Sequence, residues 1–146
     1  MIEESEDPID LYHYANELVR KSLFAEAINY YDRAIALDPE NLDCEVYVFA
    51  AWILATSPEK SLRNVLKAVV YARRACEISD YEPWPLSALA AAFAEAGNFP
   101  DAIDAQKRAI ELYGDYSDLE TAYLQKCQDR LRQYEASQTL DYDDEP

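Results

Sequence analysis

Apolar and small residues recur at helical spacing in three segments of eleven residues each, at positions 27–37, 68–78 and 102–112. Their sequences are AINYYDRAIAL, AVVYARRACEI and AIDAQKRAIEL. Steps of 0, 1, 4, 7 and 8 place five residues of each copy on one face of an α-helix, and all of these except Gln106 are apolar. Alanine stands at steps 0 and 7 in every copy, which lets a neighbouring helix approach closely. The pattern predicts three amphipathic helices that pack in the same way.

The spacing of the three copies indicates a repeat of helical hairpins. Their first residues lie 41 and 34 positions apart, and a period of about 34 residues is typical of helix–turn–helix repeats. A partner helix is expected before each copy. Asp7 and Pro8 form a start signal for the first one, and Gly97 and Pro100 separate the two helices of the last hairpin. We expect seven helices, near residues 8–21, 24–37, 42–56, 65–79, 84–96, 100–112 and 117–135.

The last of these helices is expected to close the repeat array. Ser117 and Glu120 form a capping box at its start. Its apolar stripe consists of Leu119, Tyr123, Cys127, Leu131 and Tyr134. A helix in this place covers the apolar face that the final hairpin would otherwise expose.

An aromatic residue three positions before the first alanine completes a family pattern in two of the hairpins. The matching residues are Phe24, Ala27 and Ala34 in the first hairpin and Phe99, Ala102 and Ala109 in the third. Over about residues 8–114 the chain resembles the tetratricopeptide repeat family. The closing proline of the family pattern is met by Pro39 but not by Asp80 or Gly114, and its first-helix tryptophan is replaced by Leu11 and Leu86. The resemblance implies an all-α fold, a right-handed α-α superhelical solenoid of three helical hairpins with a capping helix.

One domain of this kind is expected over residues 8–136. Its hairpins are expected at about 8–39, 42–80 and 83–114, followed by the cap at 117–136. Both ends are strongly acidic, so residues 1–7 and 137–146 are predicted to be disordered and solvated.

The middle hairpin contains the most apolar stretch of the chain. Residues 46–55 are all apolar or aromatic, and Pro58 is expected to end this helix near Thr56. A membrane span needs roughly 20 such residues. The stretch therefore predicts a helix that is buried on most sides between two neighbouring hairpins.

Charge and cysteine content narrow the class of protein. The formal net charge of −16 disfavours nucleic-acid binding, because phosphates would be repelled. Three widely spaced cysteines and an acidic start predict a cytoplasmic protein with reduced, buried thiols. A basic patch interrupts the acidic chain at Lys60, Arg63, Lys67, Arg73 and Arg74. Two interpretations of it remain open, a solvated surface or a docking site for an acidic segment, including the protein's own ends.

No pattern in the chain points to catalysis. His13 is the only histidine, no nucleophile motif accompanies it, and two isolated glycines cannot form a phosphate-binding loop. No paired spacing of metal ligands is found. We therefore expect a non-enzymatic protein without cofactor or metal.

The resemblance implies a concave groove lined by the first helix of each hairpin. The candidate groove residues are Tyr12, Asn16, Val19, Val48, Trp52, Trp84, Ser87 and Ala91. Relatives that clamp a chaperone's carboxylate tail use lysine and arginine in this row, whereas this chain has Tyr12, Trp84 and Ala88 there. A peptide or protein partner that carries basic and bulky apolar residues is expected, with tryptophan as its anchor. The alternative is a structural or self-associating module in which the groove is incidental, and a burial of both tryptophans in the core would favour it.

Overall fold

The computed structural model describes residues 2–114, 121–143 and 146, without the side chains of Glu3 and Thr121. In these residues the chain is all-α, with seven α-helices and no strand. The α-helices are α1 (Pro8–Arg20), α2 (Phe24–Leu37), α3 (Cys44–Thr56), α4 (Val65–Ser79), α5 (Pro83–Glu95), α6 (Phe99–Gly114) and α7 (Thr121–Glu135). Two short 3-10 helices are η1 (Ile2–Glu4) and η2 (Lys60–Leu62). The predicted all-helical architecture is confirmed, and the bounds of α1 to α6 differ from the predicted ones by one or two residues where they differ. The capping box expected at Ser117–Glu120, with Leu119, lies outside the described residues.

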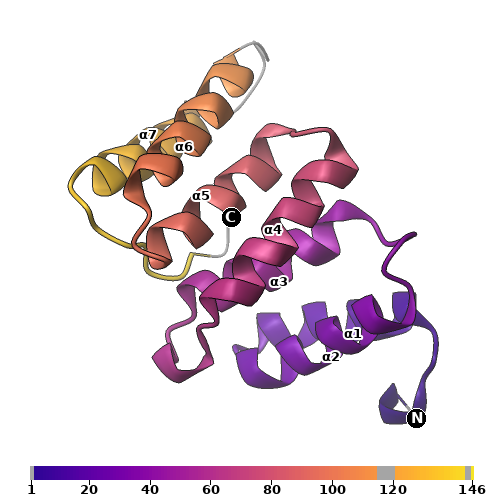
Figure 1. Ribbon diagram of the computed structural model, residues 1–146. Helices are drawn as coiled ribbons and strands as arrows, with labels where there is room; N and C mark the ends of the chain where they lie inside the picture. The colour runs from indigo at the N-terminus through magenta and orange to yellow at the C-terminus, as the bar shows by residue number, and fades with distance from the viewer. Residues whose placement is uncertain (1, 115–120, 144–145) are drawn as a thin grey trace.

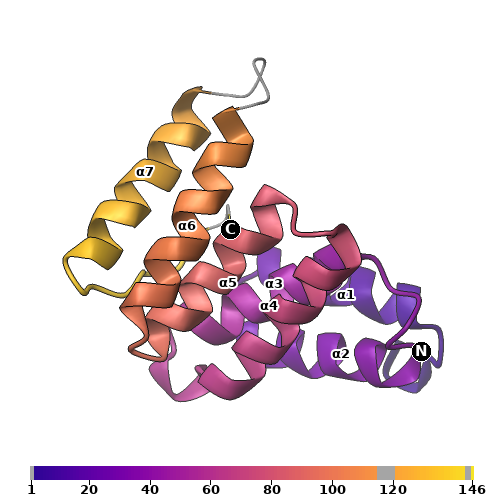
Figure 2. The ribbon, with the colours of Figure 1, turned by 45° about the horizontal axis from the view of Figure 1, so that its top comes forward.

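Neighbouring helices pair in chain order. The principal contacts join α1 to α2, α3 to α4 and α5 to α6, while α7 packs against α6. Further contacts join α2 to α3, α4 to α5 and α3 to α5. The pairs therefore follow one another through the molecule, from α1 and α2 at one end to α6 and α7 at the other (Figures 1 and 2).

Local sequence signals explain where several helices begin and end. The Asp7 carboxylate accepts a hydrogen bond of 2.9 Å from the Ile9 amide at the start of α1, and the Asn64 side chain accepts one of 3.1 Å from the Lys67 amide at the start of α4. After α5, Gly97 adopts a φ of 79°, a conformation that glycine reaches without steric penalty. α3 ends at Thr56, two residues before Pro58, as the proline predicts.

The repeated alanines lie at the closest packing surfaces. Ala27 and Ala34 in α2, Ala68 and Ala75 in α4, and Ala102 and Ala109 in α6 are all fully buried. The second helix of every pair therefore uses its two alanines as contact points, as the repeat predicts. A methyl group at these positions leaves room for the neighbouring backbone, which a larger side chain would displace.

α3 has no polar face, because it is enclosed by α2, α4 and α5. Val46, Val48, Ala50, Ala51 and Ile53 are each no more than 1% exposed. None of the helices in the described part of the chain combines the length and the apolarity that a membrane span requires.

Both ends differ from the expected solvated segments. At the N-terminus η1 forms, and Ile2 packs against the hydrophobic core. At the C-terminus Leu140 is only 6% exposed and belongs to the same core, with Tyr142 packed against it. At the C-terminus, apolar residues between the acids, rather than net charge, decide where the segment lies.

Replacing Ala75 by leucine should destabilise the fold by about 1–3 kcal/mol, because extra methyl groups would be forced into a fully buried contact of α4. The matched control is Val70→Leu on the same helix, where the side chain is 62% exposed and the change should be close to neutral. Urea unfolding followed by circular dichroism measures both. Equal stabilities of the two variants would contradict the packing role of the repeated alanine.

Candidate functional site

A cavity of about 480 Å³ opens between the first three helices and the C-terminal segment. α1 contributes Asn16, Val19 and Arg20, and Ser22 follows from the turn after it. The remaining wall consists of Tyr31 from α2, Phe49, Trp52 and Ile53 from α3, and Tyr142 and Pro146 from the C-terminal segment. The residues that line this cavity, together with Lys126 and Arg130 on the adjoining face of α7, are called the groove below.

The C-terminal segment, residues 138–143 and 146, reaches the groove because the chain reverses after α7. Ser137 adopts a left-handed conformation with a φ of 56°. The Gln138 amide donates a hydrogen bond of 2.8 Å to the Gln133 carbonyl, which ends α7 with a tight turn. The segment then runs without regular secondary structure back toward the middle of the molecule, where the C-terminus lies (Figures 1 and 2).

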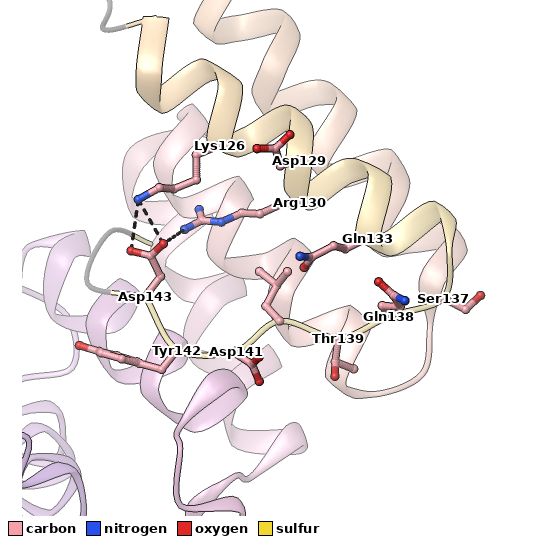
Figure 3. A pocket seen from close by; sticks show the side chains of 11 residues that line it. Lys126, Asp129, Arg130, Gln133, Ser137, Gln138, Thr139, Asp141, Tyr142 and Asp143 are labelled. Carbon is pink, nitrogen blue, oxygen red and sulfur yellow. Dashed lines mark hydrogen bonds and ion pairs between the residues drawn. The ribbon is translucent and has the colours of Figure 1, made fainter.

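Asp143 is held through both its main chain and its side chain. Its carbonyl oxygen accepts a hydrogen bond of 2.6 Å from the Trp52 indole nitrogen. Its carboxylate lies 3.1 Å from the Lys126 ammonium group and 3.8 Å from the Arg130 guanidinium, both on α7 (Figure 3). The Arg130 guanidinium also lies 4.8 Å from the centre of the Trp52 ring. Trp52, Arg130 and Lys126 thus form one binding unit for an acidic residue and its main chain.

Leu140 and Tyr142 supply the apolar contacts of the segment. The Tyr142 ring meets the Phe24 ring edge to face, with centroids 4.7 Å apart, and Leu140 is buried. A second cavity of about 680 Å³ lies on the other side of the segment, between it and α7 (Figure 3). In that view Asp143 points toward α7, whereas Asp141 points away from it and is exposed. Leu140, Tyr142 and Asp143 therefore contact the body of the protein, and Asp141 between them faces solvent.

The eight predicted groove residues divide into three groups. Asn16, Val19 and Trp52 line the 480 Å³ cavity. Trp84 is half-buried and packs edge to face on Phe49 at 5.4 Å, next to the cavity wall. The other four, Tyr12, Val48, Ser87 and Ala91, are buried. The two tryptophans are therefore not both core residues, and Trp52 owes part of its cover to the C-terminal segment.

The basic patch is largely engaged within the chain. Arg63 pairs with Glu95 at 3.2 Å, Lys67 pairs with Asp32, and Arg74 pairs with Glu40 at 3.3 Å. The Arg73 guanidinium lies 5.4 Å from the centre of the Phe93 ring, and Lys60 is exposed in η2. Three of the five charges thus tie the region of α4 to other elements, and the acidic C-terminal segment binds α7 instead.

The cysteines carry no reactive or metal-binding arrangement in the described residues. All three are free, Cys76 and Cys127 are buried, and burial raises the pKa of Cys76 to about 12, so that its thiol stays protonated. The Cys127 carbonyl accepts a hydrogen bond of 3.0 Å from the buried Gln106 side chain, which joins α6 to α7. Among the described residues no group of three or more His, Cys, Asp or Glu side chains gathers as a metal site.

Sequence reasoning missed the residues that hold the C-terminal segment. Phe24, Tyr31, Phe49, Lys126 and Arg130 were not candidates. A usable signal was present, because Leu140-Asp141-Tyr142-Asp143 alternates apolar and acidic residues. Such a period of two is typical of an extended segment with one buried face.

Comparison with known proteins adds no family. No protein-family model matches the chain, and a search of curated proteins finds no relative.

Replacing Trp52 by phenylalanine should loosen the C-terminal segment, because an aromatic ring is retained while the indole N–H that donates to the Asp143 carbonyl is lost. A net hydrogen bond of about 1 kcal/mol corresponds to an opening equilibrium raised about fivefold. Faster hydrogen exchange of the amides of residues 138–143 measures this effect. The control Trp84→Phe should leave that exchange unchanged, and an equal response of both variants would contradict the assignment.

Alkaline pH should destabilise the protein through buried tyrosines. The Tyr31 hydroxyl donates to the Asn16 side chain, and burial, assisted by the proximity of Tyr142, raises the pKa of Tyr31 well above its usual value. Because the folded-state pKa lies above that of the unfolded chain, this stabilisation is complete below pH ~10 and is lost as the pH rises further. Urea unfolding at several pH values checks this. Tyr31→Phe should reduce the loss of stability between pH 9 and 11, and an unchanged loss would exclude Tyr31 as a contributor.

Proposed function

We propose that this chain is a non-catalytic protein-interaction module of the tetratricopeptide repeat type, which binds a peptide or protein partner in its groove. In this proposal the three helix pairs follow a right-handed superhelical path and α7 acts as the cap. A cytoplasmic location belongs to the same proposal, since it rests on the three unpaired cysteines.

The observation that carries the proposal is the hydrogen bond between the Trp52 indole and the Asp143 carbonyl. It is a contact between a side chain of the body and the main chain of a segment without regular secondary structure. Main-chain contacts of this kind, combined with pockets for side chains, are how proteins commonly recognise unfolded peptides. The groove thus already accommodates a stretch of extended polypeptide.

The walls of the groove have the composition of a binding surface. Tyr31, Phe49 and Trp52 line the cavity, and Phe24 contacts the segment that lies in it. Large aromatic side chains are enriched among the residues that dominate binding energy, because they bury much area with few rotatable bonds. Trp84 extends this aromatic row through its contact with Phe49.

One observation favours the alternative, a structural module with an incidental groove. The chain's own C-terminal segment occupies the groove, and Leu140 is part of the hydrophobic core. If this segment is permanently docked, it serves only to complete the fold. The two functions differ in whether another polypeptide can take its place.

Selection of peptides from a random display library on the intact chain tests the proposal. Selected peptides should compete for one site, and Trp84→Ala should weaken their binding by about 1–4 kcal/mol, the range of an aromatic anchor. Trp84 is preferred to Trp52 for truncation because it is half-buried, so that the fold should tolerate the change. The control Leu66→Ser alters an 81% exposed apolar residue of α4 and should have no effect.

Two results would count against this function. Enriched peptides that bind Trp84→Ala as well as the unmodified chain, but are lost in Leu66→Ser, would place binding outside the groove. An absence of enrichment, together with a molecular mass that rises with protein concentration, would favour the structural module.

A further inference from the structure

The C-terminal segment is bound through three chemically different contacts in four consecutive residues. Leu140 inserts into the core, Tyr142 packs on Phe24, and Asp143 meets Lys126, Arg130 and Trp52. Asp141, between them, is exposed. The segment therefore has a four-residue pattern with this spacing: an aliphatic residue at 140, any residue at 141, an aromatic residue at 142 and an acid at 143.

We propose that the groove recognises an acidic segment with this spacing in a partner protein, and that residues 140–143 are an intramolecular copy of that ligand which the partner displaces. This rests on the proposed function and adds the chemistry of the partner. It differs from the basic ligand that the net charge of −16 suggests, because the charge at the binding point is opposite to that of the whole molecule.

Charge complementarity supports an acidic partner. Lys126 and Arg130 converge on one carboxylate from adjacent turns of α7 (Figure 3). Arg130 is only 5% exposed and stacks on Trp52, so the charge that it presents is poorly screened by solvent. A basic residue at the place of Asp143 would bring a third cation to this point and would be repelled.

The docked segment competes with any external ligand at high local concentration. Only a short stretch joins the end of α7 at Glu135 to Leu140, and such tethers give effective concentrations on the order of millimolar. A partner must therefore either be abundant or make additional contacts. The 480 Å³ cavity beside Tyr142, walled by Val19, Tyr31 and Ile53, offers room for a further apolar side chain.

The experiment measures binding of a fluorescein-labelled peptide with the sequence of residues 138–143, amidated at its C-terminus, by fluorescence anisotropy. One receptor is the unmodified chain, and the other is the full-length double variant Leu140→Ser with Tyr142→Ser, whose own segment is weakened. The variant should bind the peptide at least about tenfold more tightly, since the intramolecular competitor is removed. Circular dichroism confirms that it is folded. The full-length variant Asp143→Asn provides a second receptor, because its own segment loses the ion pairs with α7 while Trp52, Lys126, Arg130 and the apolar core are unchanged.

Peptides with matched charge distinguish specific recognition from general attraction. Asp143→Asn in the peptide should weaken binding about fivefold or more, whereas Asp141→Asn should change it less than about twofold, although both remove one negative charge. On the receptor, Lys126→Gln should weaken binding, and the control Lys107→Gln, an exposed lysine of α6, should not.

Each contrary outcome overturns a defined part of the proposal. Equal losses for the two peptide substitutions would overturn the spacing, because only net charge would then matter. Tighter binding of a peptide with both acids replaced by lysine would overturn the acidic chemistry while leaving the proposed function intact. Binding of neither peptide to any folded receptor would overturn the proposal of an acidic partner segment, and the selection of peptides from the random library would then decide the proposed function separately. Dimerisation of the unmodified chain that the double variant abolishes would assign the segment to exchange between two copies.

Discussion

Close packing at the alanine pairs is the constraint on which the rest of the structure depends. Each of α2, α4 and α6 buries two alanines completely, and these contacts set how near the neighbouring helices lie. A helix pair cannot cover its own apolar face, so each pair relies on the next one, and α3, enclosed by three helices, becomes apolar all round. Three large aromatic side chains of the helices, Tyr31, Phe49 and Trp52, line the groove instead. Small residues thus mark the close helix contacts, and bulky aromatic residues line the cavity beside them.

The basic residues around α4 and those on α7 pair with different parts of the chain. The basic patch around α4 is drawn into ion pairs with Glu95, Asp32 and Glu40, so it stabilises the packing of consecutive units. Partly buried pairs of this kind are screened less by salt than surface charges are. Lys126 and Arg130 instead hold a segment that is joined to the body by a single turn. The first set of ion pairs joins parts of the helical body, whereas the second set joins the body to its C-terminal segment.

The sequence predicts the helices well because their signals are local. The period of the apolar residues, the cap at Asp7 and the break at Pro58 all act within a few positions, and the helices begin and end close to them. The site is less accessible to such reasoning. Trp52 and Asp143 are 91 positions apart, and their contact depends on how α7 is placed relative to α3. The number of acidic residues in the C-terminal segment predicted that it would be solvated. The two apolar residues between those acids, Leu140 and Tyr142, instead pack on the core.

The intrinsic fluorescence of Trp52 reports whether the groove is occupied. Its indole is 2% exposed while Asp143 accepts its N–H and Arg130 covers its ring. Indole emission moves to longer wavelength when water reaches the ring, so departure of the segment changes the spectrum and arrival of another ligand reverses the change. Trp84, half-buried on Phe49, contributes a steadier background. Occupancy of the groove is therefore readable by fluorescence in the unlabelled protein, with no knowledge of what enters it.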